Sequence, residues 1–270
     1  MRSSLRAGLL AFAVTVLAGC STLVPAPSGP TPTPAAAHAA WARVLVDFVD
    51  PRGEVDFEAL AQRRADLDSF LRYVAVTPLD SLRDGPERLA HMINAYNALS
   101  MFNVIESGVP STHAGWHKVV FFVLRKVEVG GSSMSLRSFE NDVIRPYARS
   151  RADPRVHFAL NCSALSCPAL PRVPFTPESL DDELDRETRA FFARPENFRI
   201  DAANRIVWLS EILKFYPDDF VPLSAASLLE YANRYAPTRA PTTFEVRYTP
   251  YDWTIANSRR RVVRSSAGPD

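Results

Sequence analysis

The hydrophobic pattern of residues 86–107 constrains the fold more than any other feature of the chain. Over this range apolar residues recur every three or four positions, at Leu89, Ile93, Tyr96, Leu99 and Phe102. This spacing is typical of a helix with a buried face. Gly108 and Pro110 follow directly and would end such a helix. We therefore expect a long helix at the centre of the fold.

The rest of the chain mixes expected helices and strands without regular alternation. We expect helices near residues 39–49, 56–71, 138–144, 176–192, 210–215 and 224–235. We expect strands near residues 119–124, 126–129, 133–136, 156–160, 200–209 and 244–248, some of them paired as β-hairpins. This mixture predicts the α+β class. No repeat and no second Pro-rich linker follows residue 40, so we expect a single mixed domain over residues 41–257.

The first twenty residues have the pattern of an export signal. Arg2 and Arg6 precede an apolar stretch, residues 9–17, that is too short to span a bilayer. The stretch leads into Leu17-Ala18-Gly19-Cys20, which resembles the signal of bacterial lipoproteins. The resemblance implies that residues 1–19 are a signal peptide and that Cys20 carries lipid on its sulfur and amine.

Lipidation of Cys20 would make the membrane a partner of the protein, because several acyl chains such as palmitate give stable anchoring. Ser21 rather than Asp follows Cys20, and by the same resemblance this favours the outer membrane, facing the periplasm. Residues 20–40 are rich in Pro, Ser, Thr and Ala, which predicts an extended linker. We expect the fold to begin near Trp41 and to end before a basic, flexible tail, residues 258–270.

The most distinctive polar segment is residues 153–168, which contains His157, Asn161, Cys162 and Cys167 in a loop after the expected buried strand 156–160. Three interpretations of the cysteines stay open. They form a disulfide, as suits an exported protein. Alternatively, one of them is a thiol nucleophile activated by His157 or His91. The third, a metal site, has a spacing that matches no common zinc pattern, so we predict neither a metal nor a cofactor.

Polar residues also interrupt two of the expected helices. His91, Asn94 and Asn97 share one face of the central helix. The asparagines either tie that helix to neighbouring backbone or line a pocket. Glu140 and Arg145 are either solvated helix charges or paired groups in a cleft.

Five segments together resemble one known family. They are residues 91–99, 135–146, 153–168 and 214–220 and the closing Tyr251-Asp252-Trp253. In this order they resemble the domain of unknown function 547 (DUF547) family, over roughly residues 41–257. The family has no activity attached to its name. The resemblance implies one α+β domain in which His91, Asn94, Glu140, His157 and Cys162 approach one cleft. Many relatives have a histidine where this chain has Asn141.

Two functions are compatible with these residues. The first is a lipid-anchored cell-envelope protein whose polar cleft binds an envelope peptide, glycan or protein partner. The second is a thiol-dependent amide or peptide hydrolase or acyl transferase. In that case Cys162 would be the nucleophile and His157 the base, with His91 as its substitute, while Asn161 or Asn94 would orient the base or stabilise an oxyanion. A formal net charge of +1 argues against nucleic acid as a partner.

Overall fold

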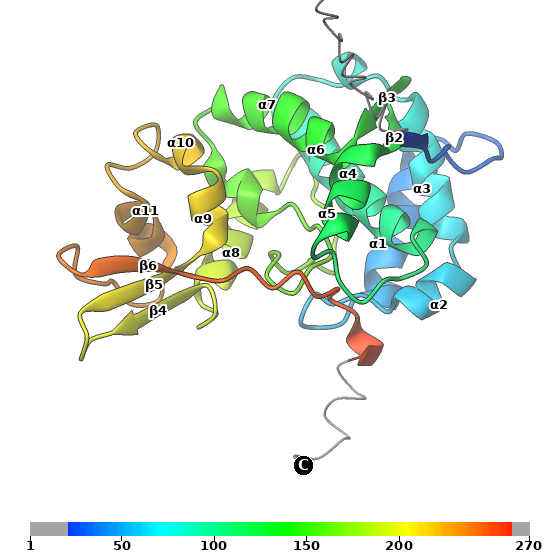
Figure 1. The fold of residues 1–270 in the computed structure, drawn as a ribbon. Helices are drawn as coiled ribbons and strands as arrows, with labels where there is room; N and C mark the ends of the chain where they lie inside the picture. Colours follow the sequence, from blue (N-terminus) through cyan, green and yellow to red (C-terminus); the bar gives the residue numbers. More distant parts are fainter. Residues whose placement is uncertain (1–20, 261–270) are drawn as a thin grey trace, which may run out of the picture.

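The computed structural model describes residues 21–260 as one α+β domain made of helices and two small three-stranded sheets (Figure 1). Helices α1 to α7 gather on one side of the molecule, and β4 to β6 lie on the other side with α9 to α11. No helix in this part of the chain is both long enough and apolar enough to cross a bilayer.

The expected central helix is present as α4 (Pro86–Glu106). Every residue from Leu89 to Val104 is buried, so the helix is enclosed on all sides and not on one face alone. Helices α1 (Pro34–Phe48), α2 (Phe57–Gln62) and α3 (Ala65–Val76) pack with it around the larger hydrophobic core. A short 3₁₀ turn, Leu79–Ser81, leads from α3 to α4.

The first sheet joins the N-terminal segment to the expected hairpin. Strands β2 (Arg125–Val129) and β3 (Ser132–Ser135) are antiparallel around Gly130 and Gly131, whose positive φ angles suit a tight turn. Strand β1 (Thr22–Leu23) pairs with β2 in parallel.

This pairing corrects the expected linker. The described residues 21–40 are not a free tether, because β1 extends the first sheet and α1 already begins at Pro34, where the Thr33 side chain caps it. The fold therefore begins well before Trp41. Residues 1–20 and 261–270, which include the expected signal peptide, the lipidation site and most of the expected basic tail, lie outside the described residues.

The second sheet belongs to a smaller core. Strands β4 (Phe198–Asp201) and β5 (Ile206–Ser210) form the expected hairpin, and β6 (Glu245–Thr249) pairs with β5 in parallel. Aromatic side chains fill this core. The helices around it are α8 (Leu180–Phe192), α9 (Glu211–Phe215), α10 (Pro217–Phe220) and α11 (Leu228–Tyr235).

Two expected strands are helical instead. Residues 116–124 form α5 (Trp116–Val119) and a π-helical segment, Val120–Leu124. The segment expected as a buried strand is a 3₁₀ helix, Pro154–Phe158. We call the residues that follow it, 159–168, the Cys loop. Pro154 suits the first turn of a helix, and the Asp153 side chain accepts the Arg155 N–H there. In the second segment Val156 and Phe158 are buried, whereas in the first only Phe121 is buried and Val119 and Val123 are exposed. A short apolar run does not by itself distinguish a strand from a helical turn.

The expected helix 138–144 also extends further than predicted. Helix α6 (Leu136–Ser138), a π-helical segment (Phe139–Ile144) and α7 (Arg145–Arg149) form one continuous helical run through Pro146. Proline inside an α-helix clashes with the carbonyl group four residues earlier. Here the residues directly before α7 form a π-helical turn in place of an α-helical one. We call residues 136–149 the Glu140 helix below.

Candidate functional site

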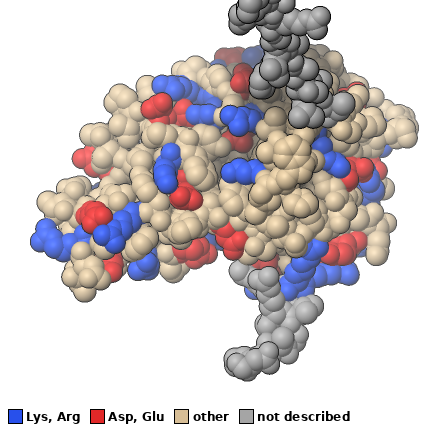
Figure 2. Space-filling view, in the orientation of Figure 1, with Lys and Arg blue, Asp and Glu red and all other residues tan. Residues whose placement is uncertain are grey.

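A cleft of about 400 Å³ lies where the two cores meet. Its lining comes from α4, from the Glu140 helix, from residues 118–122, from the Cys loop, from α9 with Tyr216, and from the segment 251–253. Aromatic side chains form much of the wall, namely Phe122, Phe215, Tyr216, Tyr251 and Trp253. Basic and acidic side chains are interspersed on the face of the molecule shown in Figure 2, with no large patch of one sign. The cleft therefore combines apolar walls with a few charged groups, as ligand sites commonly do.

Glu140 places a buried carboxylate in the cleft. It is 8% exposed, and its two oxygens accept hydrogen bonds from Tyr96 Oη at 2.9 Å and Tyr216 Oη at 2.6 Å. Burial, together with the charge of Glu140, raises the pKa of both phenols, so they remain protonated donors. No basic side chain of residues 21–260 comes within 4.0 Å of this carboxylate. Glu140 thus keeps acceptor capacity for a ligand.

A second polar group surrounds His157. Its Nε2 lies 2.8 Å from Asp219 Oδ2, and Arg145 Nε donates to the same oxygen at 2.7 Å. The imidazole stacks on Tyr216 with a centroid distance of 4.4 Å. Burial alone would raise the pKa of Asp219, but the hydrogen bonds from His157 and Arg145 outweigh it and hold that pKa at about 2. Asp219 therefore stays ionised and orients both His157 and Arg145.

Two cations line the cleft without a carboxylate partner. Lys118 Nζ lies 3.7 Å from the ring centroid of Trp253, in a cation–π contact. Burial lowers the pKa of Lys118, and the positive charge of Arg137 lowers it further while Glu211 opposes this. Within residues 21–260, neither Lys118 nor Arg137 has a carboxylate oxygen within 4.0 Å. Both are free to pair with an anionic ligand.

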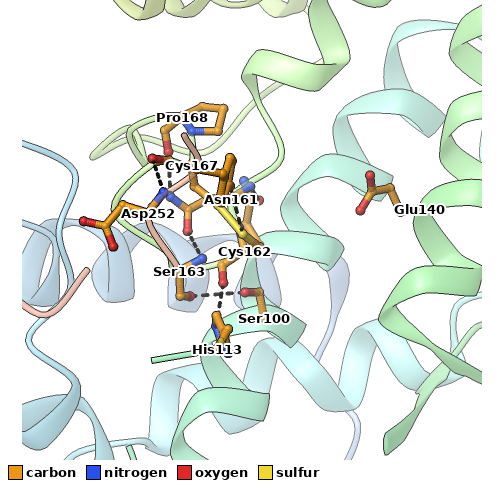
Figure 3. Close-up of a disulfide and its surroundings, with 12 residues drawn as sticks. Ser100, His113, Glu140, Asn161, Cys162, Ser163, Cys167, Pro168 and Asp252 are labelled. Carbon is orange, nitrogen blue, oxygen red and sulfur yellow. Dashed lines mark hydrogen bonds between the residues drawn. A yellow bond between two sulfur atoms is a disulfide. The ribbon is translucent and has the colours of Figure 1, made fainter. Parts of the chain in front are cut away.

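The Cys loop contributes a disulfide to the wall (Figure 3). The structure places Cys162 and Cys167 as a disulfide pair, in agreement with the first of the three interpretations. The phenol of Tyr251 lies 3.0 Å from Cys167 Sγ and 3.4 Å from Cys162 Sγ. Asn161 folds over the loop, where its side chain donates to Pro168 O and accepts the Ser163 N–H. In this state Cys162 carries no free thiol.

The expected convergence of five residues on one cleft is wrong in part. Glu140, His157 and Cys162 line the cleft, and so does Arg145. His91 and Asn94 instead line a separate cavity beside α1 and α3. Hence His91 does not replace His157 as a base for Cys162.

The asparagines serve as internal ties. Asn94 accepts the indole N–H of Trp41 and forms two hydrogen bonds with the backbone of Phe175. Asn97 joins α4 to the Cys loop, because its amide donates to Ala159 O and accepts the Asn161 N–H. Asn161 itself lies outside the cleft lining. Asn94, Asn97 and Asn161 thus hold backbone in place.

Tyr216 and Lys118, which line the cleft, and Asp219, which contacts the cleft residues His157 and Arg145, were not predicted as site residues. Asp219 and Tyr216 lie in the aromatic-acidic turn 213–220, whose pattern is also explained by capping and packing. Lys118 is one of only three lysines in the chain, which is a weak signal that it has a specific role. No group of three or more His, Cys, Asp or Glu side chains in the described part of the chain is arranged to hold a metal ion.

Comparison with known proteins shows a similarity to one family over part of the chain. Neither the curated proteins nor the solved structures gave a match. The family model described as "Protein of unknown function, DUF547" matches residues 79–192. This range contains α4, the Glu140 helix and the Cys loop, but not the cleft residues from α9 onward. The match supports, over residues 79–192, the resemblance to the DUF547 family of proteins of unknown function that the sequence predicted.

Proposed function

We propose that this protein is a lipid-anchored cell-envelope protein whose cleft binds a small acidic ligand of the envelope, such as a peptide fragment of the cell wall. The observation that carries the proposal is the distribution of charge around the cleft. Lys118 and Arg137 lack carboxylate partners among the described residues, while Glu140 is buried without a basic partner there. A ligand with an anionic group and a hydrogen-bond donor complements both features.

The physical chemistry of each part fits such a ligand. Lysine and arginine bind carboxylates through charge-assisted hydrogen bonds. The aromatic walls provide apolar contact for the body of the ligand. Glu140 accepts an N–H or O–H from the ligand with lone pairs that Tyr96 and Tyr216 do not occupy.

The thiol-dependent alternative has less support. It requires a free thiolate at Cys162, whereas that sulfur is bonded to Cys167. It also requires His157 to take a proton from the thiol, whereas His157 Nε2 is paired with Asp219. Ligand binding requires neither a free thiol at Cys162 nor the release of His157 from Asp219.

The envelope location supports the same proposal. The lipoprotein-like signal ending at Cys20 favours attachment to the outer membrane on the periplasmic side. A disulfide within the fold is compatible with that oxidising compartment.

The test measures ligand binding by the full-length protein extracted in detergent. The probe is the set of soluble fragments released from purified bacterial cell wall, compared with the same fragments after amidation of their carboxylates. We expect calorimetry to detect binding of the untreated fragments and a loss of at least about tenfold in affinity after amidation, the scale of one charge-assisted hydrogen bond.

Variants of the cleft cations sharpen this test. Lys118→Met and Arg137→Met should each weaken binding by about tenfold. Arg239→Met is the matched control, because Arg239 is exposed and lines a different cavity. No binding of the fragments, or equal effects of all three substitutions, would overturn the proposal.

A further inference from the structure

The disulfide Cys162–Cys167 lies in the cleft wall and not in either hydrophobic core. Both cysteines line the cleft. They form a small cluster of their own with Ala164, against which Phe122 and Tyr251 pack. The cavity that they line has a volume of about 400 Å³, which is large enough to admit a small thiol or a cysteine side chain. Both cysteines are largely buried, and Cys162, at 7% exposed, is slightly more accessible than Cys167, at 4%.

Hydrogen bonds hold the Cys loop independently of the disulfide. Asn161 spans it by donating to Pro168 O and accepting the Ser163 N–H, both at 2.7 Å. The segment after β6 adds two backbone bonds, from Leu165 N–H to Thr254 O and from Ser166 N–H to Asp252 O. A disulfide that closes so short a loop adds less stability through chain entropy than one that closes a long loop. The bond can thus open while the loop keeps its shape.

The two sulfurs have different surroundings. Cys167 Sγ lies 3.0 Å from both the Cys162 backbone N–H and the Tyr251 hydroxyl group, whereas Cys162 Sγ has only the Tyr251 hydroxyl at 3.4 Å. Burial and the charge of Glu140 raise the pKa of Tyr251, so the phenol keeps its proton and can donate it to sulfur. These donors would stabilise a thiolate at Cys167 more than one at Cys162.

We propose that Cys162–Cys167 is a redox-active disulfide, in which Cys162 is the sulfur attacked by an incoming dithiol and Cys167 is the leaving thiolate. The attacking thiolate forms a bond to Cys162 Sγ while the Cys162–Cys167 bond breaks, and that electron pair remains on Cys167, which then takes a proton. The second thiolate of the reductant attacks its own sulfur in the mixed disulfide and releases Cys162. Two electrons and two protons pass to the protein, and the dithiol becomes a disulfide.

The first test maps the site of attack on the folded, full-length protein. The protein is treated briefly with the monothiol 2-mercaptoethanol, quenched with acid and alkylated. Cys162 and Cys167 fall in one tryptic peptide, residues 156–172, because no Lys or Arg lies between Arg155 and Arg172. Fragmentation of this peptide should show the mixed disulfide on Cys162 and the alkyl group on Cys167, with a preference of at least about fivefold.

Two outcomes of this mapping would overturn the proposal. One is an adduct mainly on Cys167, which would reverse the assigned roles. The other is a disulfide that reacts in denaturant but not in the folded protein, which would make it a purely structural bond.

The second test measures the rate of reduction by dithiothreitol. Tyr251→Phe removes one donor to Cys167 Sγ while keeping the ring, so reduction should slow by about three- to tenfold. Tyr248→Phe is the control, because Tyr248 lies on β6, just before the segment that contains Tyr251, and makes no contact with sulfur in the described structure. Equal rates for wild type and both variants would show that the Tyr251 hydroxyl has no part in the exchange. Neither test depends on which ligand the cleft binds.

Discussion

His91 is a buried histidine on α4 whose ring nitrogens have no hydrogen-bond partner in the described part of the chain. Burial, assisted by the charge of His38, lowers its pKa from 6.5 to about 4. Between these two pH values His91 is protonated in the unfolded chain but neutral in the folded protein. The stability contributed by neutral His91 is therefore complete above pH 6.5 and is lost as the pH falls toward 4.

Replacing His91 tests this assignment. His91→Met fills the site with a flexible apolar side chain and removes the titrating group. We expect the free energy of unfolding of the variant, relative to wild type, to be higher at pH 5 than at pH 7 by about 2 kcal/mol. Urea unfolding at both pH values measures the difference in unfolding free energy between the variant and wild type. If that difference is the same at both pH values, the assignment is contradicted.

Asp219 acts in a lower pH range. Its pKa lies at about 2, compared with 3.8 for an ordinary carboxyl group, because the hydrogen bonds from His157 and Arg145 outweigh the effect of burial. The stability it contributes is present above pH 3.8 and is lost as the pH falls through 2. Because of this group, the free energy of unfolding of wild type should fall by about 2 kcal/mol between pH 4 and 2. The free energy of unfolding of Asp219→Asn should fall by that much less over the same pH range. Urea unfolding at several acidic pH values checks this, and parallel slopes would refute it.

Only part of the site was accessible to sequence reasoning at the level of residues. Glu140, Arg145, His157 and the cysteine pair lie in short polar segments that differ visibly from their surroundings. Their partners Tyr216, Asp219 and Tyr251 lie 62 to 89 residues away in the chain. No local spacing links groups so far apart, so these pairs required the three-dimensional structure.

At the scale of elements, the long helix and both hairpins were predicted, whereas residues 119–124 and 156–160 were not. The helix was predicted from a long run of apolar residues at helical spacing, and the hairpins were predicted from the turn residues between their strands. The two failures are short apolar runs, which have the same composition in a strand and in a helical turn. In the second run Pro154 and the capping side chain of Asp153 favour the helical form.

The contact between α4 and the Cys loop can be tested through Asn97. Asn97→Ala leaves the buried Ala159 C=O and Asn161 N–H without their partner, so we expect a loss of about 2–4 kcal/mol in unfolding free energy. Hydrogen exchange at the Asn161 amide should also become faster.

A matched control separates this local effect from general destabilisation. Asn233 on α11 makes the same pair of hydrogen bonds with Ala240, at 2.9 and 2.8 Å. Asn233→Ala should therefore destabilise the protein while the Asn161 amide exchanges by local opening as in wild type. If both variants accelerate exchange at Asn161 equally, Asn97 is not a specific link to the loop.

At the scale of the whole molecule, the segment after β6 connects the two cores. It runs from the second sheet back along the larger core (Figure 1), where His113 N–H bonds to Trp253 O and Val55 N–H to Ala256 O. On the way it supplies Tyr251 and Trp253 to the cleft. The α+β class was predictable from the mixture of elements. The path of the segment after β6 along the larger core was not predictable, because it depends on contacts between residues far apart in the chain.

The lipid anchor is the prediction that concerns the protein in its cell. If Cys20 carries the acyl chains, growth with labelled palmitate should label wild type, and Cys20→Ser should abolish the label. Cys167→Ser is the control and should keep it, since that residue lies inside the fold. A further variant, in which residues 1–20 are replaced by an ordinary cleavable export signal, should move the protein from the membrane fraction to the soluble periplasmic fraction, because it then lacks the acyl chains that hold it at the bilayer. Retention of that variant in the membrane would mean that another part of the chain, or a partner, provides the attachment.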